Sequence, residues 1–191
     1  MRYRSSKHIS LNPIVIIILL NFLLLITTFI NREFIIGTLG LWPIFFLKKP
    51  WTIVTSMFLH AGFWHLFGNM LTLFFFGSYL SRLVGDGKFL IVYFGGGILG
   101  SILFILLAPP FSVAVGASGA VYAVAGALVM LRPNLRVLLY FIIPMPLWAV
   151  ITLFFVVFSF IPGVAWQAHL GGLIVGLTAG YFFRRRERYR V

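Results

Sequence analysis

Side chains that could do covalent chemistry are few in this chain, and they fall in three strongly apolar segments. One segment carries His65 and Asn69, the next carries the run Gly116-Ala117-Ser118-Gly119, and the last carries His169. Polar and ionisable side chains inside a membrane are costly, so each is a functional-site hypothesis by default. A serine with a histidine predicts nucleophilic catalysis, in which the imidazole takes the hydroxyl proton. The three segments therefore predict a serine hydrolase site buried in lipid.

The composition requires a membrane setting for that site. Of the 191 residues, 61% are hydrophobic and 9% are charged, and the mean hydropathy is +1.07. Soluble domains have about a quarter of their residues charged. We therefore expect an all-α polytopic membrane protein, with a single membrane domain over residues 1–191 and no room for a sizeable soluble one. The absence of cysteine excludes disulfides and thiol catalysis.

Six apolar segments are each near the length of about 20 residues that a helix needs to cross a bilayer. The predicted spans are Pro13–Ile30, Phe63–Leu80, Phe89–Leu107, Val113–Leu131, Val137–Phe158 and Ala168–Phe183. Pro144 and Pro146 lie inside the fifth span. Because proline disrupts a helix interior, the fifth helix is expected to start later than Val137.

The cations indicate which way the spans run. Twelve of the fifteen Lys and Arg residues lie at the termini and in the second and fourth connections: Arg2, Arg4, Lys7, Arg82, Lys88, Arg132, Arg136, Arg184, Arg185, Arg186, Arg188 and Arg190. The positive-inside rule puts this face, with short basic tails at 1–10 and 184–191, in the cytoplasm of a cell-membrane protein. The net charge of +12 then reflects topology and contact with anionic lipid, and nucleic acid is not an expected partner.

This topology brings the polar residues together. Spans two, four and six all run inward, so their N-terminal turns lie in the external leaflet, and those turns carry His65, Ser118 and His169. Water can reach a site at that depth through the loops. The free N–H groups and positive dipole ends of helix N-termini also favour a developing oxyanion.

Ser118 stands on unusually bare backbone. Gly116 and Gly119 flank it, and Tyr122, four residues on, shares its helical face and could stack on a facing imidazole. Small residues also let membrane helices pack closely, so this motif alone leaves a structural role for Ser118 open.

His169 begins a glycine stripe. Gly172 and Gly176 follow on the same helical face, which predicts close packing against the helix of Ser118. A histidine bonded to a backbone carbonyl is the alternative. The acidic residues of the chain all lie outside the predicted spans: Glu33, Asp86 and Glu187. Serine and histidine would thus work as a dyad, without the carboxylate of a triad.

His65 and Asn69 lie four residues apart and face one direction. As hydrogen-bond donors they suit an oxyanion hole; the alternative is hydrogen bonding between helices, which contributes about 1 kcal/mol or less. His60 lies about 140° round the helix from His65. That position favours a structural or loop-bonding role for His60 and leaves a role at the edge of the site open.

In this order, the motifs resemble those of the rhomboid intramembrane serine proteases. The resemblance rests on His65-x-x-x-Asn69, Gly116-Ala117-Ser118-Gly119 and Ala168-His169-Leu170-Gly171-Gly172, and it covers nearly all of the chain from Pro50 onward. It implies a six-helix rhomboid bundle that cleaves transmembrane protein substrates without a cofactor or metal. It also implies a Ser118–His169 dyad, an oxyanion hole of His65, Asn69 and the Ser118 N–H, and stacking of Tyr122 on His169.

The resemblance further implies that substrates reach the site past the fifth span and the cap before the sixth. Those are Trp148, Phe154, Phe155, Phe158 and the segment Ser159–Gln167, although a lipid-facing helix shows the same aromatic residues. Hydrogen bonds shield the backbone of a membrane helix, so substrates with helix-weakening Gly or Pro and small residues at the cut are expected.

Two positions depart from the usual rhomboid pattern. Thr52 follows Trp51 where many members have arginine, and Ser81 stands where an acidic residue often ends the second span. Neither position belongs to the predicted dyad. The departures concern the anchoring of the first external loop and the cytoplasmic end of the second span.

Other functional classes fit the sequence less well. A metal-dependent membrane hydrolase would use His60, His65 and His169, but residues five apart do not share a helix face and the spans hold no carboxylate. A transporter would show duplicated halves with broken helices, which this chain does not. A non-catalytic rhomboid-like binder is the remaining alternative, and the sequence indicates no oligomeric state.

Overall fold

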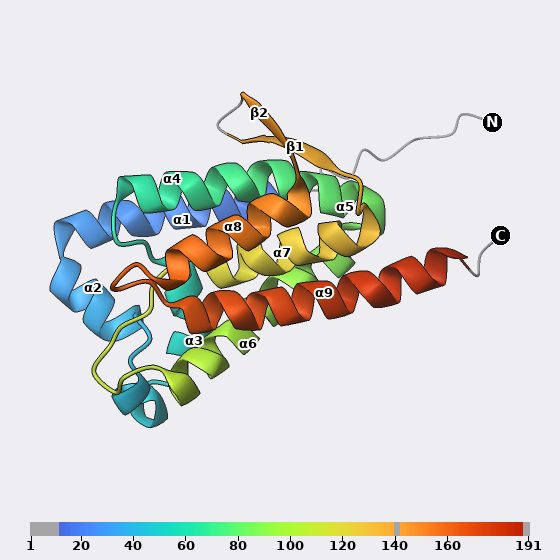
Figure 1. Ribbon diagram of the computed structural model, residues 1–191. Coiled ribbons are helices and arrows are strands. Elements are labelled where there is room, and N and C mark those ends of the chain that lie inside the picture. The colour runs from blue at the N-terminus through green and yellow to red at the C-terminus, as the bar shows by residue number, and fades with distance from the viewer. Residues whose placement is uncertain (1–11, 140–141, 189–191) are drawn as a thin grey trace, which may run out of the picture.

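The computed structural model describes residues 12–139 and 142–188, and for residues 186–188 the backbone alone. Its elements are α1 (Pro13–Ile30), α2 (Arg32–Leu39), the 3-10 helix η1 (Pro43–Lys48), α3 (Thr52–Thr55), the 3-10 helix η2 (Ser56–Phe58), α4 (Phe63–Thr72), the π-helical turn η3 (Leu73–Gly77), α5 (Ser78–Val84), α6 (Asp86–Leu107), α7 (Ser118–Leu131), β1 (Arg136–Leu139), β2 (Ile143–Pro146), α8 (Leu147–Ser159) and α9 (Trp166–Arg188) (Figure 1). The predicted tail 1–10 with Arg2, Arg4 and Lys7, and Arg190 near the other end, lie outside the described residues.

The first three predicted helices match the structure closely. α1 has the predicted bounds, because Asn12 caps its first turn through a hydrogen bond to the Ile14 N–H. The second helix runs without a break from α4 through η3 and α5. The third, α6, begins three residues earlier than predicted, because Gly85 at φ 88° ends α5 and Asp86 opens the next helix.

The fourth helix begins later than predicted, and the fifth begins after Val137, as its two prolines led us to expect. α7 starts at Ser118 and not at Val113, because Ala114 pairs with Leu41 in a β-bridge and Gly116 adopts φ 135°. The segment after Val137 forms an antiparallel hairpin, and α8 starts at Leu147, directly after the two prolines. The last helix, α9, starts two residues before Ala168 and extends beyond Phe183.

Apolar side chains cover the outside of the bundle. α1, for example, exposes Leu19, Leu23 and Ile26. Soluble proteins rarely expose contiguous apolar surface of this kind. α1 and α6 are long and apolar enough to cross a membrane by length and composition, whereas α7 and α8 are shorter apolar helices.

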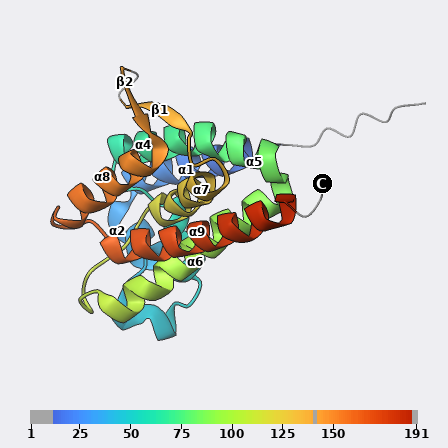
Figure 2. The ribbon, with the colours of Figure 1, turned by 45° about the vertical axis from the view of Figure 1, so that its right-hand side comes forward.

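The core forms around α7. Figures 1 and 2 show α7 at the centre of the bundle, and its residues from Gly119 to Leu128 are all buried. The glycines of α9 lie against its backbone: Gly172 faces the Gly119 carbonyl, Gly176 faces the Ala123 carbonyl, and Gly180 faces the Ala127 carbonyl. A side chain at these positions would collide with backbone atoms, so the close contact between α7 and α9 requires glycine.

The segment after α2 folds back onto the end of that helix. The last four carbonyls of α2 each accept a hydrogen bond from a side chain further along: Ile36 from Trp42, Gly37 from Lys49, Thr38 from Trp51, and Leu39 from Thr55. Helix ends leave such carbonyls without intrahelical partners, and of these four only Ile36 also accepts from the described backbone, from the Gly40 N–H. The departure at Thr52 fits into this loop, because its buried hydroxyl donates to the Lys49 carbonyl.

Candidate active site

Ser118 and His169 meet where α7 and α9 begin. Ser118 is the first residue of α7, His169 lies in the first turn of α9, and the serine Oγ lies 2.9 Å from the imidazole Nε2. The helices come this close because Gly119 lies against the Ala168 carbonyl, where an added Cβ would stand 3.0 Å from the oxygen. The two predicted residues, 51 positions apart in sequence, thus share a hydrogen bond.

A tight turn before α7 presents the serine. Gly116 has φ 135°, a conformation that L-residues with side chains rarely adopt, and its N–H donates to the Ser56 carbonyl at 2.9 Å. A Cβ at this position would also stand 2.9 Å from Cε1 of His65. Both the backbone angle and the lack of space therefore demand glycine here.

The imidazole of His169 lies flat against an aromatic ring. The rings of Tyr122 and His169 stack with centroids 4.6 Å apart and planes 24° apart. The ring of Phe155 in α8 packs edge-on against the ring of Tyr122, with the two centroids 6.2 Å apart. The buried Nδ1 of His169 has no hydrogen-bond partner among residues 12–139 and 142–188. Within the described residues no hydrogen bond to Nδ1 orients the His169 ring. Packing against Tyr122 orients it instead.

His65 lies in the first turn of α4, and its side chain points toward the Gly116 turn that precedes α7. Its Nδ1 accepts a long hydrogen bond, 3.5 Å, from the Ala61 N–H. That contact assigns the proton to Nε2, which stands 3.0 Å from the position of a Cβ at Gly116. Asn69 lies one turn deeper and donates from Nδ2 to the His65 carbonyl at 2.8 Å. Nδ2 carries a second N–H for a further acceptor.

His60 lies behind His65, outside the helices. It is buried, its Nε2 accepts a 3.5 Å hydrogen bond from the Ala117 N–H, and its ring meets the His65 ring edge-on at 5.0 Å. Burial, with His65 nearby as a second cause, lowers the pKa of His60 to about 3. A neutral ring can accept the N–H of Ala117. His60 thus both bonds the loop and borders the candidate site.

Some contacts that hold the site were not expected from the sequence. Gly100 of α6 lies against the Ala168 carbonyl, and Met57 fills the space over Gly97. The signal was present, because Gly96 and Gly100 are spaced one helical turn apart in α6. The contact of Gly100 with Ala168 shows that α6 also supports the turn that carries His169.

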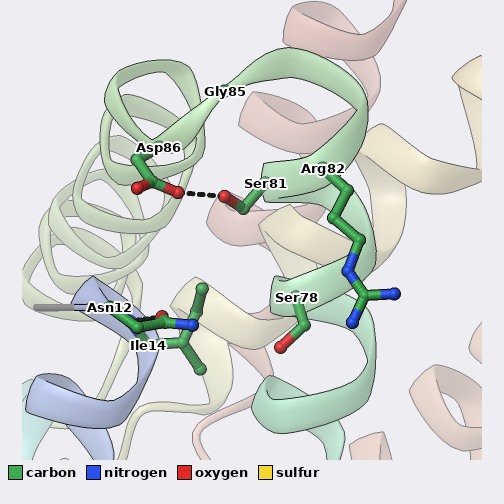
Figure 3. A pocket seen from close by; sticks show the side chains of 7 residues that line it. All are labelled: Asn12, Ile14, Ser78, Ser81, Arg82, Gly85 and Asp86. Atoms are coloured by element: carbon green, nitrogen blue, oxygen red, sulfur yellow. Dashed lines mark hydrogen bonds between the residues drawn. The ribbon is translucent and has the colours of Figure 1, made fainter. Parts of the chain in front are cut away.

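A cavity lies away from this site. It holds about 410 Å³ and is lined by Asn12, Ile14, Ser78, Ser81, Arg82, Gly85 and Asp86 (Figure 3). Along the α4–α5 helix Ser81 lies about 24 Å beyond His65. The departure at Ser81 is explained there, since its hydroxyl donates to the Asp86 carboxylate and joins the end of α5 to α6 (Figure 3).

Comparison with known proteins identifies the family of the chain. The rhomboid domain family matches residues 47–186. The chain belongs to the rhomboid family. It is a membrane-embedded serine protease of the rhomboid type, and its mostly helical fold with a rhomboid domain agrees with the expectation.

Several relatives carry rhomboid names. The chain is 37% identical to the putative rhomboid protease YdcA of Bacillus subtilis (strain 168) over 145 residues, which cover 72% of this chain and 70% of the relative. It is 33% identical to the mitochondrial rhomboid protein 1 of Saccharomyces cerevisiae, over 70% of this chain and 42% of that protein. It is 35% identical to the rhomboid protease GluP of Bacillus subtilis, over 68% of this chain and 25% of that protein. The matches to the last two therefore span less than half of those proteins.

Proposed function

We propose that this protein cleaves the transmembrane helices of membrane-protein substrates near the external face of the cell membrane. Ser118 is the nucleophile and His169 the general base. The observation that carries this proposal is the 2.9 Å contact between their reacting atoms at the start of α7. A serine and an imidazole at hydrogen-bond distance meet the geometric requirement for nucleophilic catalysis.

The chemistry follows from those positions. His169 Nε2 takes the Ser118 Oγ proton as the oxygen attacks the substrate carbonyl carbon, which gives a tetrahedral oxyanion. The imidazolium then protonates the leaving amine, and the C–N bond breaks to leave an acyl-enzyme. Water, deprotonated by His169, then attacks the ester carbon. The C–Oγ bond breaks, the imidazolium returns its proton to Oγ, and the new carboxyl terminus of the substrate leaves. Stacking on Tyr122 holds the ring in place of the usual carboxylate.

The oxyanion has three donors available in this proposal. The Ser118 N–H belongs to the first turn of α7, where backbone N–H groups have no intrahelical acceptor. The His65 Nε2 faces the Gly116 turn from α4, and Asn69 has a spare N–H one turn below. Donors fixed in a low-dielectric site stabilise developing charge without reorganisation.

The topology proposed for the chain has six spans and cytoplasmic termini in a single domain, with α4, α7 and α9 all running inward. Its support is that His65, Ser118 and His169 lie in the first turns of those three helices and meet in space. The site then lies in the external leaflet. α8 buries Leu147 and Val150 and exposes Trp148, which makes it the proposed side of substrate access.

A fluorophosphonate probe tests the proposed nucleophile directly. We expect purified protein to be labelled once, with the probe on Ser118 when the peptides are analysed by mass spectrometry. Absence of labelling in folded protein that binds a transmembrane peptide would favour the non-catalytic binder. Loss of cleavage with a chelator, and not with the probe, would favour the metal-dependent hydrolase.

Replacing Asn69 by alanine is expected to lower kcat by about 10²- to 10³-fold with little change in KM, because the lost donor acts in the transition state. His65→Ala should fall in the same range. If both donors serve one oxygen, the double variant should lose less transition-state stabilisation than the sum of the losses of the two single variants. The measurement is single-turnover cleavage in liposomes. A fully active Asn69→Ala protein that melts early would instead make Asn69 a residue of helix packing.

The pH dependence should report a single base. We expect kcat/KM to rise about tenfold per pH unit on the acidic side and then level off, because only the neutral imidazole can take the serine proton. The measurement is cleavage of one peptide across the pH range in which the protein stays folded. A flat profile with Ser118 still required would count against a titrating histidine.

A further inference from the structure

A short β-hairpin joins α7 to α8, and in Figures 1 and 2 its strands β1 and β2 project upward from the bundle, on the side where α4 lies. Its described apolar side chains are open to the surroundings: Leu138 is 57% exposed, Ile142 78% and Ile143 52%. Such side chains are ordinary on a lipid-facing helix. On a hairpin outside the helices, exposed apolar side chains indicate a surface that lipid or another molecule covers.

The length of α8 points to lipid. Its 13 residues rise about 20 Å, whereas the hydrocarbon core is about 30 Å thick. At this edge of the bundle the remaining depth must be met by the chain that precedes or follows α8. The hairpin is directly attached to the start of α8, since the Leu147 N–H donates to the Leu135 carbonyl at 2.8 Å.

The outer edge of β2 is compatible with lipid for a chemical reason. Val137 pairs with Met145, and Leu139 pairs with Ile143. Counted in steps of two from the hydrogen bond of the Leu147 N–H to the Leu135 carbonyl, these are the pairs whose N–H groups point across the ladder. In an antiparallel ladder the alternate residues direct their N–H groups outward. In β2 those residues are Pro144 and Pro146, which have no N–H. An unpaired N–H in lipid would be costly, and this edge carries none at either position.

We propose that this hairpin is an interfacial membrane anchor. Its exposed residues Leu138, Ile142 and Ile143 insert at the headgroup boundary of the cytoplasmic leaflet and hold the start of α8 there. The exposed Arg136 on β1 lies at the same level and fits the phosphates of anionic lipid. The assignment to the cytoplasmic leaflet rests on the topology of the proposed function, while the contact with lipid does not.

Depth measurement tests the contact with lipid. The chain has no cysteine, so a nitroxide can be placed at one position with no background. We would label Ile143→Cys in liposomes and compare its access to oxygen and to a water-soluble nickel chelate. Ile91→Cys on the exposed face of α6 is the reference in hydrocarbon, and Asn134→Cys in the exposed turn after α7 is the reference in water.

The label at position 143 is expected to favour oxygen over the nickel chelate and to lie between the two references. Access equal to that at Asn134 would overturn the proposal and leave a soluble protein partner as the occupant. Fluorophosphonate labelling of Ser118 is recorded on the same samples. A water-exposed hairpin with labelled Ser118 would refute the anchor alone, and a buried hairpin with unlabelled Ser118 would refute the proposed function alone.

Activity provides a second readout. Ile143→Asp is expected to lower cleavage in liposomes by about fivefold or more, whereas Ile143→Leu keeps full activity and both variants react normally with the probe in detergent. Arg136→Gln should lose about fivefold in the preference for phosphatidylglycerol vesicles over phosphatidylcholine vesicles. If Ile143→Asp does not fold, Ile143→Ser takes its place. Equal cleavage by all variants in both vesicles would contradict the anchor.

Discussion

Replacing Ser118 by alanine is expected to abolish cleavage of a transmembrane substrate, with a loss of about 10⁴-fold or more, while the protein folds normally. The alanine side chain keeps the Cβ that packs at the start of α7 and removes the oxygen that lies 2.9 Å from His169. Removal of a serine nucleophile leaves the residual rate that binding and the oxyanion hole supply. The measurement is cleavage in liposomes with the melting temperature recorded in detergent.

Ser112→Ala is the matched control, since its hydroxyl bonds to the Pro109 carbonyl in the loop before α7. This variant should cleave at the unaltered rate. If Ser118→Ala still cut the substrate at a comparable rate, with contaminating proteases excluded, the serine mechanism would be wrong.

Gly176→Val is expected to destabilise the protein by about 3 kcal/mol or more, or to prevent folding. A Cβ at position 176 would stand 2.8 Å from the Ala123 Cα and closer still to its carbonyl oxygen. Backbone cannot move aside as a flexible side chain does, so α9 would have to separate from α7. That separation would also pull His169 away from Ser118. The measurements are thermal unfolding in detergent and probe labelling of Ser118.

Gly68→Ala serves as the control for a glycine in a helix. A Cβ at this position in α4 would meet no atom within 4 Å. Alanine there should leave the melting temperature unchanged or slightly higher, because glycine is the weaker helix former. A Gly176→Val protein as stable and as readily labelled as Gly68→Ala would show that the glycine stripe does not hold α7 and α9 together.

The bounds of a helix could be predicted from the sequence where a single apolar run, ended by polar residues, defines that helix. α1 has the predicted bounds because an N-cap and a polar Asn31 delimit one apolar run. The start of α7 could not be predicted in this way, because residues 113–117 are as apolar as the helix that follows. For α8 the prolines predicted a start later than Val137 but not the hairpin before it. These starts depend on a β-bridge between Ala114 and Leu41, on the angle at Gly116 and on the pairing of β1 with β2. Periodicity and composition do not record such long-range pairings.

The candidate site could be assembled from sequence because alternating spans bring helix N-termini to one leaflet. That argument placed His65, Ser118 and His169 near one another, and the structure has them so. It did not give the hydrogen bond from the Gly116 N–H to the Ser56 carbonyl or the contact of His60 with Ala117. Both join segments whose mutual position only the folded loop determines.

The four side chains that satisfy the last carbonyls of α2 have a consequence for local opening. Each of those carbonyls accepts from a residue of the segment from Trp42 to Thr55, so unwinding the end of α2 would break all four of its hydrogen bonds to that segment. In hydrogen-exchange terms, we therefore expect residues 32–55 to open as one cooperative unit. Their amide protons should exchange with a common opening free energy, and Trp51→Phe, which deletes one donor, should speed exchange across all of them together.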